Sequence, residues 1–336
     1  MADVGIAVVG CGRAAANRVA PAIRRSRGAL LVGFCSRDRE RARQYAEQFC
    51  APEAYDRLDA LLVDDRVEAV YIGTPNALHA EQALACLRAG RHVLVDKPMA
   101  LTTNDARRMQ DAAKAAGRTL TVLHQQRFHP AHGALRERVH SGALGRLTWI
   151  RAEMGYLSPP DLQNWRQDPA LAGGGPGWDL GPHAIDMLLA VGGQVRSAAG
   201  RTANVRFRYP VEDFFHGQIV FASGAIGLVD LSFCGYSQGG RLEVRGDEST
   251  FVSEGSLMAA HDYRWALYRG PGRMAVETQE GAFTEQFVRA VEDFADAVRG
   301  NRPPAVTAED GVAVCRVLED LYVSARNRDE RPAPGV

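Results

Sequence analysis

The sequence predicts two domains: an α/β domain built on a parallel sheet, and an α+β domain with an open-faced, mostly antiparallel sheet. Three observations lead to this expectation. The chain has 336 residues, more than one hydrophobic core usually serves. Its first part alternates short β-branched runs with helical patterns, and the remainder carries longer strand-like stretches separated by turn residues.

The first domain is expected over residues 1–125. Apolar, β-branched runs predict its strands at 5–9, 30–35, 67–72, 92–95 and 119–123. Helical patterns between them predict helices at 15–27, 38–49, 78–89 and 103–116. This alternation is typical of βαβ units around a parallel sheet.

The second domain is expected over residues 126–303. It begins with a helix at 130–141, and its predicted strands are 147–155, 195–209, 215–222, 225–233, 241–245 and 263–268. Closing helices are predicted at 284–299 and 309–325. We expect a C-terminal helix over 304–326 to pack back on the first domain, and residues 327–336 to form a frayed tail.

The composition excludes several classes of protein. The 40 Lys and Arg residues balance 40 Asp and Glu residues, which argues against general nucleic-acid binding. No apolar run reaches the roughly 20 residues of a membrane-spanning helix, and the N-terminal residues lack the basic region of a signal peptide. The six cysteines are scattered without a C-x-x-C pair. We therefore expect a cytoplasmic protein with no nucleic acid, membrane or metal as partner.

A glycine-rich loop follows the first predicted strand. The residues Gly10-Cys11-Gly12-Arg13-Ala14-Ala15 form a G-x-G-x-x-A pattern that opens a helix. Gly10 permits the tight turn, Gly12 lets backbone approach a pyrophosphate, and Ala15 allows close packing of helix and strand. This context predicts a dinucleotide-binding Rossmann domain, with Gly10, Gly12, Arg13 and Ala14 as cofactor-binding residues.

The end of the second predicted strand favours NADP(H), with NAD(H) as the alternative. A site specific for NAD usually has an acidic residue there that bonds the ribose 2′-hydroxyl. This chain has Ser36-Arg37-Asp38. Ser36 and Arg37 suit a 2′-phosphate, whereas Asp38 either bonds the ribose or serves as the N-cap of the next helix.

Several further motifs point to one family. They are Gly73-Thr74-Pro75-Asn76 with His79, Val95-Asp96-Lys97-Pro98, Arg127-Phe128-His129-Pro130, Trp165-Arg166, Gly173-Gly174-Gly175, and Asp179 with His183. With these motifs the chain resembles the Gfo/Idh/MocA oxidoreductase family, which includes glucose–fructose oxidoreductase, inositol dehydrogenases and anhydrofructose reductase. The resemblance implies a Rossmann domain paired with an open-faced second domain.

The resemblance also implies where cofactor and substrate bind. The cofactor-binding set that it adds is Thr74, Pro75, Asn76, His79, Asp96, Lys97, Pro98, Trp165 and Arg166. The substrate-binding set is Lys97, Arg127, Tyr156, Asp179 and His183. This chain departs from the family at Asp96, where Glu is usual, and at Gln125, where Asn is common. The Lys97–Pro98 bond is expected to be cis, as a tight turn allows.

Three of these residues are candidates for catalysis. Lys97 and Lys114 are the only two lysines among the 40 Lys and Arg residues. In a chain whose usual basic residue is Arg, a Lys inside a tight motif suggests a site that an Arg could not fill. His183 would accept the proton of an alcohol, Asp179 would orient and stabilise the imidazole, and Lys97 would hydrogen-bond the reacting oxygen. Asp179 and His183 are four apart, a spacing that a helix would place on one face, with Gly181 and Pro182 in a first turn.

The leading interpretation is an NAD(P)-dependent dehydrogenase or reductase acting on a secondary alcohol or ketone of a sugar, cyclitol or glycosylated metabolite. The alternatives are a redox-assisted, NAD-dependent glycosidase and a non-catalytic NAD(P)-binding sensor. A homodimer or homotetramer is expected through the open sheet face, which would otherwise expose apolar surface. The alternation of Phe215, Gly217, Ile219 and Phe221 fits either this face or core packing.

Overall fold

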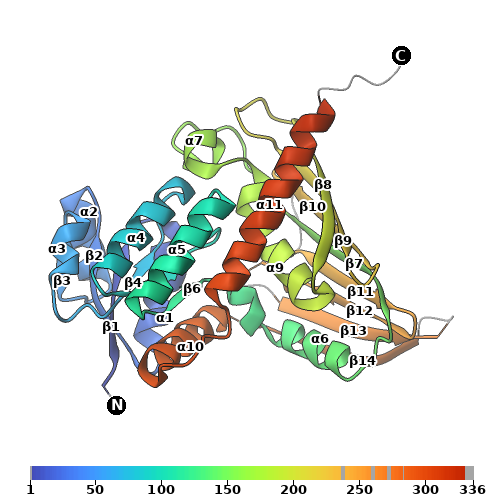
Figure 1. The fold of residues 1–336 in the computed structure, drawn as a ribbon, viewed down its shortest axis with the longest axis horizontal. Helices are drawn as coiled ribbons and strands as arrows, with labels where there is room; N and C mark the ends of the chain where they lie inside the picture. Colours follow the sequence, from blue (N-terminus) through green and yellow to red (C-terminus); the bar gives the residue numbers. More distant parts are fainter. Residues whose placement is uncertain (1, 236–238, 259–261, 271–273, 283, 330–336) are drawn as a thin grey trace. The chain divides into compact units, whose positions relative to one another are not determined.

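The computed structural model describes residues 2–329 apart from 236–238, 259–261, 271–273 and 283 (Figure 1). The chain forms two compact units. The first comprises Met1–Gln125 and Glu285–Cys315, and the second comprises Gln126–Thr284 and Arg316–Val336.

The first unit contains a six-stranded parallel sheet in the order β3-β2-β1-β4-β5-β6. Its strands are β1 Val4–Val9, β2 Ala29–Cys35, β3 Glu53–Tyr55, β4 Ala69–Ile72, β5 His92–Val95 and β6 Leu120–Val122. Every residue of β1 and β4 is buried, which explains their continuous apolar runs. The expected alternation is confirmed, and β3 is a short strand that the sequence pattern did not predict.

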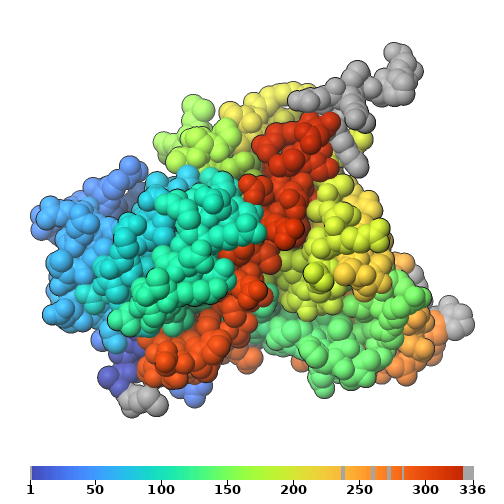
Figure 2. Space-filling model, viewed as in Figure 1, coloured from blue at the N-terminus to red at the C-terminus, as the bar shows by residue number. Residues whose placement is uncertain are grey.

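Helices pack around this sheet, and all but the last of them, which comes much later in the chain, lie between its strands in the sequence. They are η1 Ala15–Val19, α1 Ala20–Arg25, α2 Arg39–Gln48, α3 Leu58–Leu62, η2 Asn76–Leu78, α4 His79–Arg88, α5 Thr103–Ala116 and α10 Gln286–Gly300. Helix α5 begins where the Thr102 side chain accepts a hydrogen bond from the Asp105 amide, and it ends at Gly117, whose φ is 60°. Helices α4 and α5 pack side by side at the surface of this unit (Figure 2).

The second unit contains an eight-stranded sheet in the order β14-β13-β12-β11-β7-β10-β9-β8. Its strands are β7 Leu147–Gly155, β8 Val195–Ala203, β9 Phe214–Phe221, β10 Ile226–Ser232, β11 Arg241–Gly246, β12 Ser249–Glu254, β13 Asp262–Arg269 and β14 Met274–Ala282. Only the β7–β10 pair is parallel among the described pairings. The mostly antiparallel sheet is confirmed, with β12 and β14 additional to the predicted strands.

The second unit also contains helices, several of which pack on the inner face of this sheet. They are η3 Gln125–Phe128, α6 Pro130–His140, η4 Trp165–Gln167, α7 Pro169–Ala172, α8 Pro176–Asp179, α9 Gly181–Gly192 and the later part of α11 Ala308–Asp329. Phe215, Ile219 and Phe221 are fully buried on this inner face. Their alternation therefore reflects core packing, and not the open face.

Three boundaries differ from the predicted ones. The strand predicted over 195–209 ends at Ala203 as β8, because the Asp213 carboxylate accepts hydrogen bonds from the backbone amides of residues 205, 206 and 207 and turns the chain. Helix α10 groups with the first unit, although residues to 303 were expected in the second domain. Helix α11 changes unit after Cys315 and continues to Asp329; the rest of the predicted frayed tail, 330–336, lies outside the described residues.

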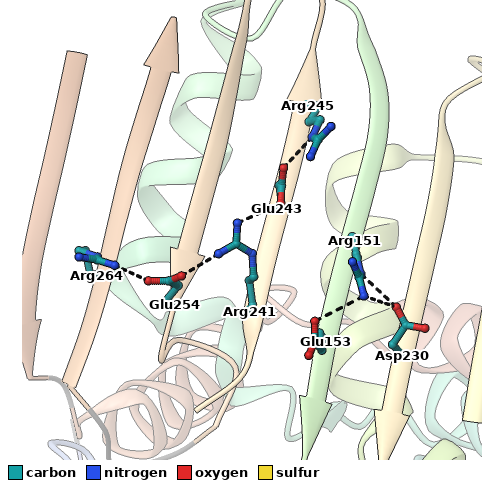
Figure 3. Close-up of polar contacts among 8 residues, drawn as sticks. All are labelled: Arg151, Glu153, Asp230, Arg241, Glu243, Arg245, Glu254 and Arg264. Atoms are coloured by element: carbon teal, nitrogen blue, oxygen red, sulfur yellow. Dashed lines mark hydrogen bonds and ion pairs between the residues drawn. The ribbon is translucent and has the colours of Figure 1, made fainter. Parts of the chain in front are cut away.

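The outer face of the eight-stranded sheet carries charge. Strand pairing aligns one titratable side chain from each strand into a row across the whole sheet, called the charged row below. From β14 to β8 it runs Glu280, Arg264, Glu254, Arg241, Glu153, Asp230, His216 and Arg201. Figure 3 shows ion pairs within and beside this row: Arg264–Glu254, Arg241–Glu254 and Arg151–Asp230, at 2.6, 2.7 and 3.0 Å. The open face thus combines the charged row with half-exposed apolar side chains such as Trp149, Ile226 and Leu228.

Within the described residues, no helix is long and apolar enough to cross a membrane.

Candidate active site

The glycine-rich loop lies at the carboxyl end of β1, beside the loop that follows β4. Gly10 has a φ of 102°, and a Cβ placed there would lie 2.7 Å from the Gly73 carbonyl oxygen. Only glycine meets both requirements without strain. The Gly10 amide also donates to the Cys35 carbonyl at 3.0 Å, so the ends of β1, β2 and β4 meet at this loop.

Gly12 differs from Gly10 because nothing in the chain requires a glycine there. A Cβ at Gly12 would have no atom within 4 Å. The helix that follows starts here, since the Ala16 amide donates to the Gly12 carbonyl at 3.0 Å, and Ala15 is buried beneath it. Open space over a glycine at the start of a helix, where amides are free, fits the approach of a dinucleotide pyrophosphate. Arg13 is exposed and Ala14 half-buried at the same helix start.

The segment after β2 shows Asp38 at the start of helix α2. Its carboxylate accepts a hydrogen bond from the Arg41 amide at 3.1 Å, so Asp38 is the N-cap of α2. Ser36 Oγ accepts from the Asp38 amide at 3.2 Å, and Arg37 is exposed. The sequence did not predict a role for Arg41. Its charge acts on Cys11 in the glycine-rich loop: burial raises the pKa of the Cys11 thiol to about 11, and the positive charge of Arg41 opposes that rise. Arg41 therefore lies near the glycine-rich loop.

His79 connects two loops of the first unit. Its Nδ1 lies 2.8 Å from the Pro98 carbonyl oxygen and its Nε2 2.9 Å from that of Thr74. Burial lowers the pKa of His79, and a neutral ring donates to only one of the two carbonyls at a time. Asn76 is buried beside this link, at 5% exposure. The His79 side chain thus lies between the loop at residues 74–76 and the loop at residues 96–98 and is within hydrogen-bond distance of both.

Lys97 lies in a turn that Asp96 organises. One Asp96 oxygen accepts from the Lys97 amide at 2.8 Å, and the other accepts from the Tyr71 hydroxyl at 2.9 Å. The Asp96 amide donates to the Ile72 carbonyl, so the turn continues from the sheet. The Lys97–Pro98 bond is cis, as expected. Asp96, which replaces the Glu usual in the family, therefore has both carboxylate oxygens engaged in hydrogen bonds. The Lys97 side chain that follows it is half-buried.

In the second unit, three predicted site residues meet at one carboxylate. Asp179 Oδ2 accepts from the Tyr156 hydroxyl at 2.8 Å, and Asp179 Oδ1 accepts from Arg166 Nε at 3.1 Å. The Arg166 guanidinium also lies over the Trp165 ring, 4.5 Å from its centroid. Trp165 and Arg166, in the short helix η4, are half-buried. The network holds the Asp179 carboxylate in one orientation.

Asp179 and His183 belong to consecutive helices, the short α8 and the longer α9, and not to the same one. Asp179 ends α8, and α9 begins at Gly181 with Pro182 in its first turn, as predicted. Leu180 joins them with helical backbone angles, and its carbonyl accepts from the His183 amide at 3.1 Å. His183 is 8% exposed in the first turn of α9.

Arg127 takes part in an ion pair that the sequence did not predict. Its Nε and Nη2 reach both oxygens of Asp186, with the closest contact at 2.7 Å. Asp186 is 1% exposed and lies three residues after His183 in α9. This buried, bidentate ion pair joins α9, which carries Asp186, to η3, which carries Arg127. The structure places Arg127 beside Asp186, while Gln125 is buried in the first unit.

Comparison with known proteins follows this geometry. Residues 4–124 match the oxidoreductase family with an NAD-binding Rossmann fold, and residues 132–252 match the GFO/IDH/MocA C-terminal domain. The 1,5-anhydro-D-fructose reductase of Ensifer adhaerens is 32% identical over 290 residues, covering 86% of each chain. This chain belongs to the Gfo/Idh/MocA family.

Other Gfo/Idh/MocA relatives agree over nearly the full length. A D-xylose 1-dehydrogenase (NADP(+)) of Haloferax volcanii is 30% identical over 322 residues, covering 95% of this chain and 96% of its own. The crystal structure of an aldose-aldose oxidoreductase from Caulobacter crescentus, complexed with glycerol, superposes with a TM-score of 0.88 at 27% identity, covering 97% and 98% of the two chains. The protein is thus an NAD(P)-dependent dehydrogenase or reductase of the Gfo/Idh/MocA family.

Sequence reasoning missed several residues of the site, among them Tyr71, Asp186 and Arg41. Tyr71 had a detectable signal, because a phenol in an otherwise apolar buried strand needs a partner for its hydroxyl. Asp186 had one as well: it is the acid on the buried stripe of a helix that Ile185 and Leu188 mark as core. Arg41 had none, since a basic residue in the first turn of a charged helix is typical of solvated surface.

Proposed function

We propose that this chain transfers a hydride between nicotinamide and a secondary alcohol or ketone of a sugar, a cyclitol or a glycosylated metabolite. The observation that carries the proposal lies in the first unit. The glycine-rich loop follows β1, residues 73–76 follow β4, and Lys97 follows β5, all at carboxyl ends of adjacent parallel strands. The order of the sheet reverses between β1 and β4, and open α/β sheets bind ligands at such a point. The names of the carbohydrate-acting relatives support the substrate class.

The catalytic roles follow from the chemistry of each side chain. When bound, the nicotinamide supplies the acceptor or donor of the hydride. Lys97 hydrogen-bonds the reacting oxygen as a compact ammonium and stabilises its developing negative charge. His183 exchanges the hydroxyl proton, since imidazole titrates near physiological pH. Asp179, held by Tyr156 and Arg166, stabilises the positively charged form of that imidazole.

NADP(H) is the cofactor that the described side chains suit better. One oxygen of Asp38 is engaged as the N-cap of α2, and the Ser and Arg residues just before Asp38 at the end of β2 suit a 2′-phosphate. Arg37 and Arg41 supply positive charge near the end of β2, where a 2′-phosphate would bind. Trp165 and Arg166 are proposed to contact the nicotinamide or the substrate, as the resemblance implies.

The test is a panel of sugars, cyclitols and aminoglycosides with NAD and NADP, followed at the nicotinamide absorbance band. Turnover with NADP and a carbohydrate is expected, and replacing Arg37 and Arg41 by Ala should raise the KM for NADP more than that for NAD. Activity with NAD alone would contradict the cofactor preference. Glycoside cleavage with no net absorbance change would favour the glycosidase, and cofactor binding without any turnover would favour the sensor.

We further propose that a second copy of this chain covers the outer face of the eight-stranded sheet. Bases and acids alternate along most of the charged row, so a two-fold axis can bring Arg241 or Arg264 of one copy opposite Glu254 or Glu153 of the other. The same face has a hollow of about 210 Å³ in which Arg241, Glu254 and Arg264 of the charged row lie beside Val252, Ala266 and Tyr268, so it offers both polar and apolar contacts. None of the predicted site residues lines this hollow.

A further inference from the structure

The loop that leads to Asp179 packs against two residues from distant parts of the second unit. A Cβ at Gly174 would lie 2.7 Å from the Tyr322 hydroxyl, and a Cβ at Gly177 would lie 2.2 Å from it. A Cβ at Gly175 would lie 1.9 Å from the Glu212 carbonyl oxygen. Close packing against Tyr322 and Glu212 therefore requires glycine at positions 174, 175 and 177, whereas Gly173 has a positive φ of 87°.

Tyr322 and Glu212 are themselves joined. The Tyr322 hydroxyl donates to Glu212 Oε1, which also accepts from the Gly177 amide at 3.3 Å. The Tyr322 ring stacks on Trp178 with centroids 5.7 Å apart, and it contacts Phe215 of β9 at 5.1 Å. Glu212 is 9% exposed, and burial raises the pKa of its carboxyl while these hydrogen bonds oppose the rise. The loop backbone is thus held through a hydrogen bond and a stacked ring.

This tether is distinct from the network around the Asp179 carboxylate. Tyr156 and Arg166 bind the two oxygens of Asp179. Tyr322 and Glu212 instead act on Gly174, Gly177 and Trp178, the backbone and side chains just before it. The first pair orients the side chain, and the second pair fixes the peptide from which that side chain projects.

We propose that Tyr322 and Glu212 are positioning residues that fix residues 173–179 and thereby set the direction of the Asp179 carboxylate. This inference rests on the proposed function for its effect on turnover. A helix near the C-terminus of the sequence then contributes to catalysis without touching the reacting atoms. Reacting groups displaced by about 1 Å lose on the order of 10²-fold in rate, so a small shift of this loop is enough to be measured.

The first experiment compares Tyr322→Phe with Tyr55→Phe. Both changes remove a tyrosine hydroxyl that donates to a carboxylate, and Tyr55 bonds Asp64 at 2.8 Å in the first unit, outside the proposed site. We expect Tyr322→Phe to lower kcat by about 10- to 100-fold with little change in the Kd for cofactor, and Tyr55→Phe to keep kcat near wild type. The pH dependence of kcat/KM should shift only in Tyr322→Phe, because only there is the environment of His183 altered.

Glu212→Gln provides the rescue. Its amide oxygen still accepts from Tyr322 and Gly177, so it should keep most of kcat, whereas Glu212→Ala should behave like Tyr322→Phe. Equal kcat and equal pH profiles in Tyr322→Phe and Tyr55→Phe would overturn the proposal.

A second measurement does not depend on any substrate. Amide hydrogen exchange in peptides covering 173–179 should be faster in Tyr322→Phe than in the wild type, and unchanged in Tyr55→Phe. Unchanged exchange in Tyr322→Phe would refute the tether even if no substrate is found. Faster exchange together with an inactive wild-type protein would instead place the failure in the proposed function.

Discussion

The two sheets of this protein use their surfaces differently. In the parallel sheet of the first unit, β1 and β4 are buried along their whole length, so the chemistry is left to the loops at their carboxyl ends. In the eight-stranded sheet, β9 and β10 alternate between buried and half-exposed residues, so one face forms a core and the other carries the charged row. The parallel sheet thus leaves only the ends of its strands for ligand binding, whereas the mostly antiparallel sheet presents a whole face to its surroundings.

The largest expected effect on stability comes from the inner face of the eight-stranded sheet. Phe251 is fully buried and stacks on Trp265 with centroids 5.2 Å apart, whereas its neighbour Val252 lies on the outer face. Phe251→Ala should lower the free energy of unfolding by about 3–5 kcal/mol. Val252→Ala, the matched change on the opposite face, should lower it by about 1 kcal/mol or less. Urea unfolding of both variants gives the comparison, and similar losses would show that the two faces do not differ as described.

A large effect on activity is expected at the carboxyl end of β5. Lys97→Arg replaces a compact ammonium with a bulkier, forked guanidinium beside the reacting oxygen. We expect kcat to fall by about 10²–10³-fold, while the Kd for cofactor changes little. Lys114→Arg on the exposed face of α5 is the control and should leave kcat unchanged. Near-wild-type turnover in Lys97→Arg would remove Lys97 from the proposed mechanism.

A smaller effect is expected on self-association. Arg241→Glu reverses one charge in the middle of the charged row and places it beside Glu254 and Glu243. Sedimentation velocity at low salt should show a shift toward monomer, and added salt should weaken the wild-type assembly in the same direction. Arg107→Glu, an exposed change on α5, should leave the sedimentation profile as it is. A wild-type protein that is monomeric at every concentration tested would refute association through this face.

The smallest effect is expected when one exposed ion pair of the charged row is removed. Arg264 pairs with Glu254, and their side chains are 59% and 40% exposed. Because exposed pairs are screened by water and salt, Arg264→Ala should lower the free energy of unfolding by less than about 1 kcal/mol. A loss as large as that of Phe251→Ala would show that the charged row stabilises the folded monomer.

The sequence predicted the fold class because hydrophobic period and glycine placement are local signals. The glycine-rich loop, the alternation of strands and helices and the cis bond before Pro98 are all confirmed, and each depends on residues close together in the chain. The N-cap position of Asp38 was one of the two roles predicted for that residue, because it too depends on neighbouring residues. Two other roles were not accessible in this way: Arg127 required its distant partner Asp186, and Gly174 and Gly177 required Tyr322, which is more than 140 residues away in the sequence.

The open face was only partly predictable. Apolar surface was expected there, and Trp149, Ile226 and Leu228 do lie half-exposed on it. The charged row was not expected, because whether a residue faces in or out depends on strand register, and a shift of one residue exchanges the two faces. Only the observed pairings align Arg241, Glu254 and Arg264 on the outer side. The sequence contained the charges without indicating that they form one row.

The position of β7 has a consequence for how the chain folds. β7 ends at Gly155, yet its two neighbours in the sheet begin only at Ile226 and Arg241. During synthesis both edges of β7 are unpaired until β10 and β11 have been made. Until then the side chains of Ile150, Ala152 and Met154, which are buried in the folded protein, lack their packing partners. Long-range pairing of this kind closes slowly. We therefore expect the sheet of the second unit to form only after β10 and β11 have been synthesised, and shorter nascent chains to be prone to aggregation.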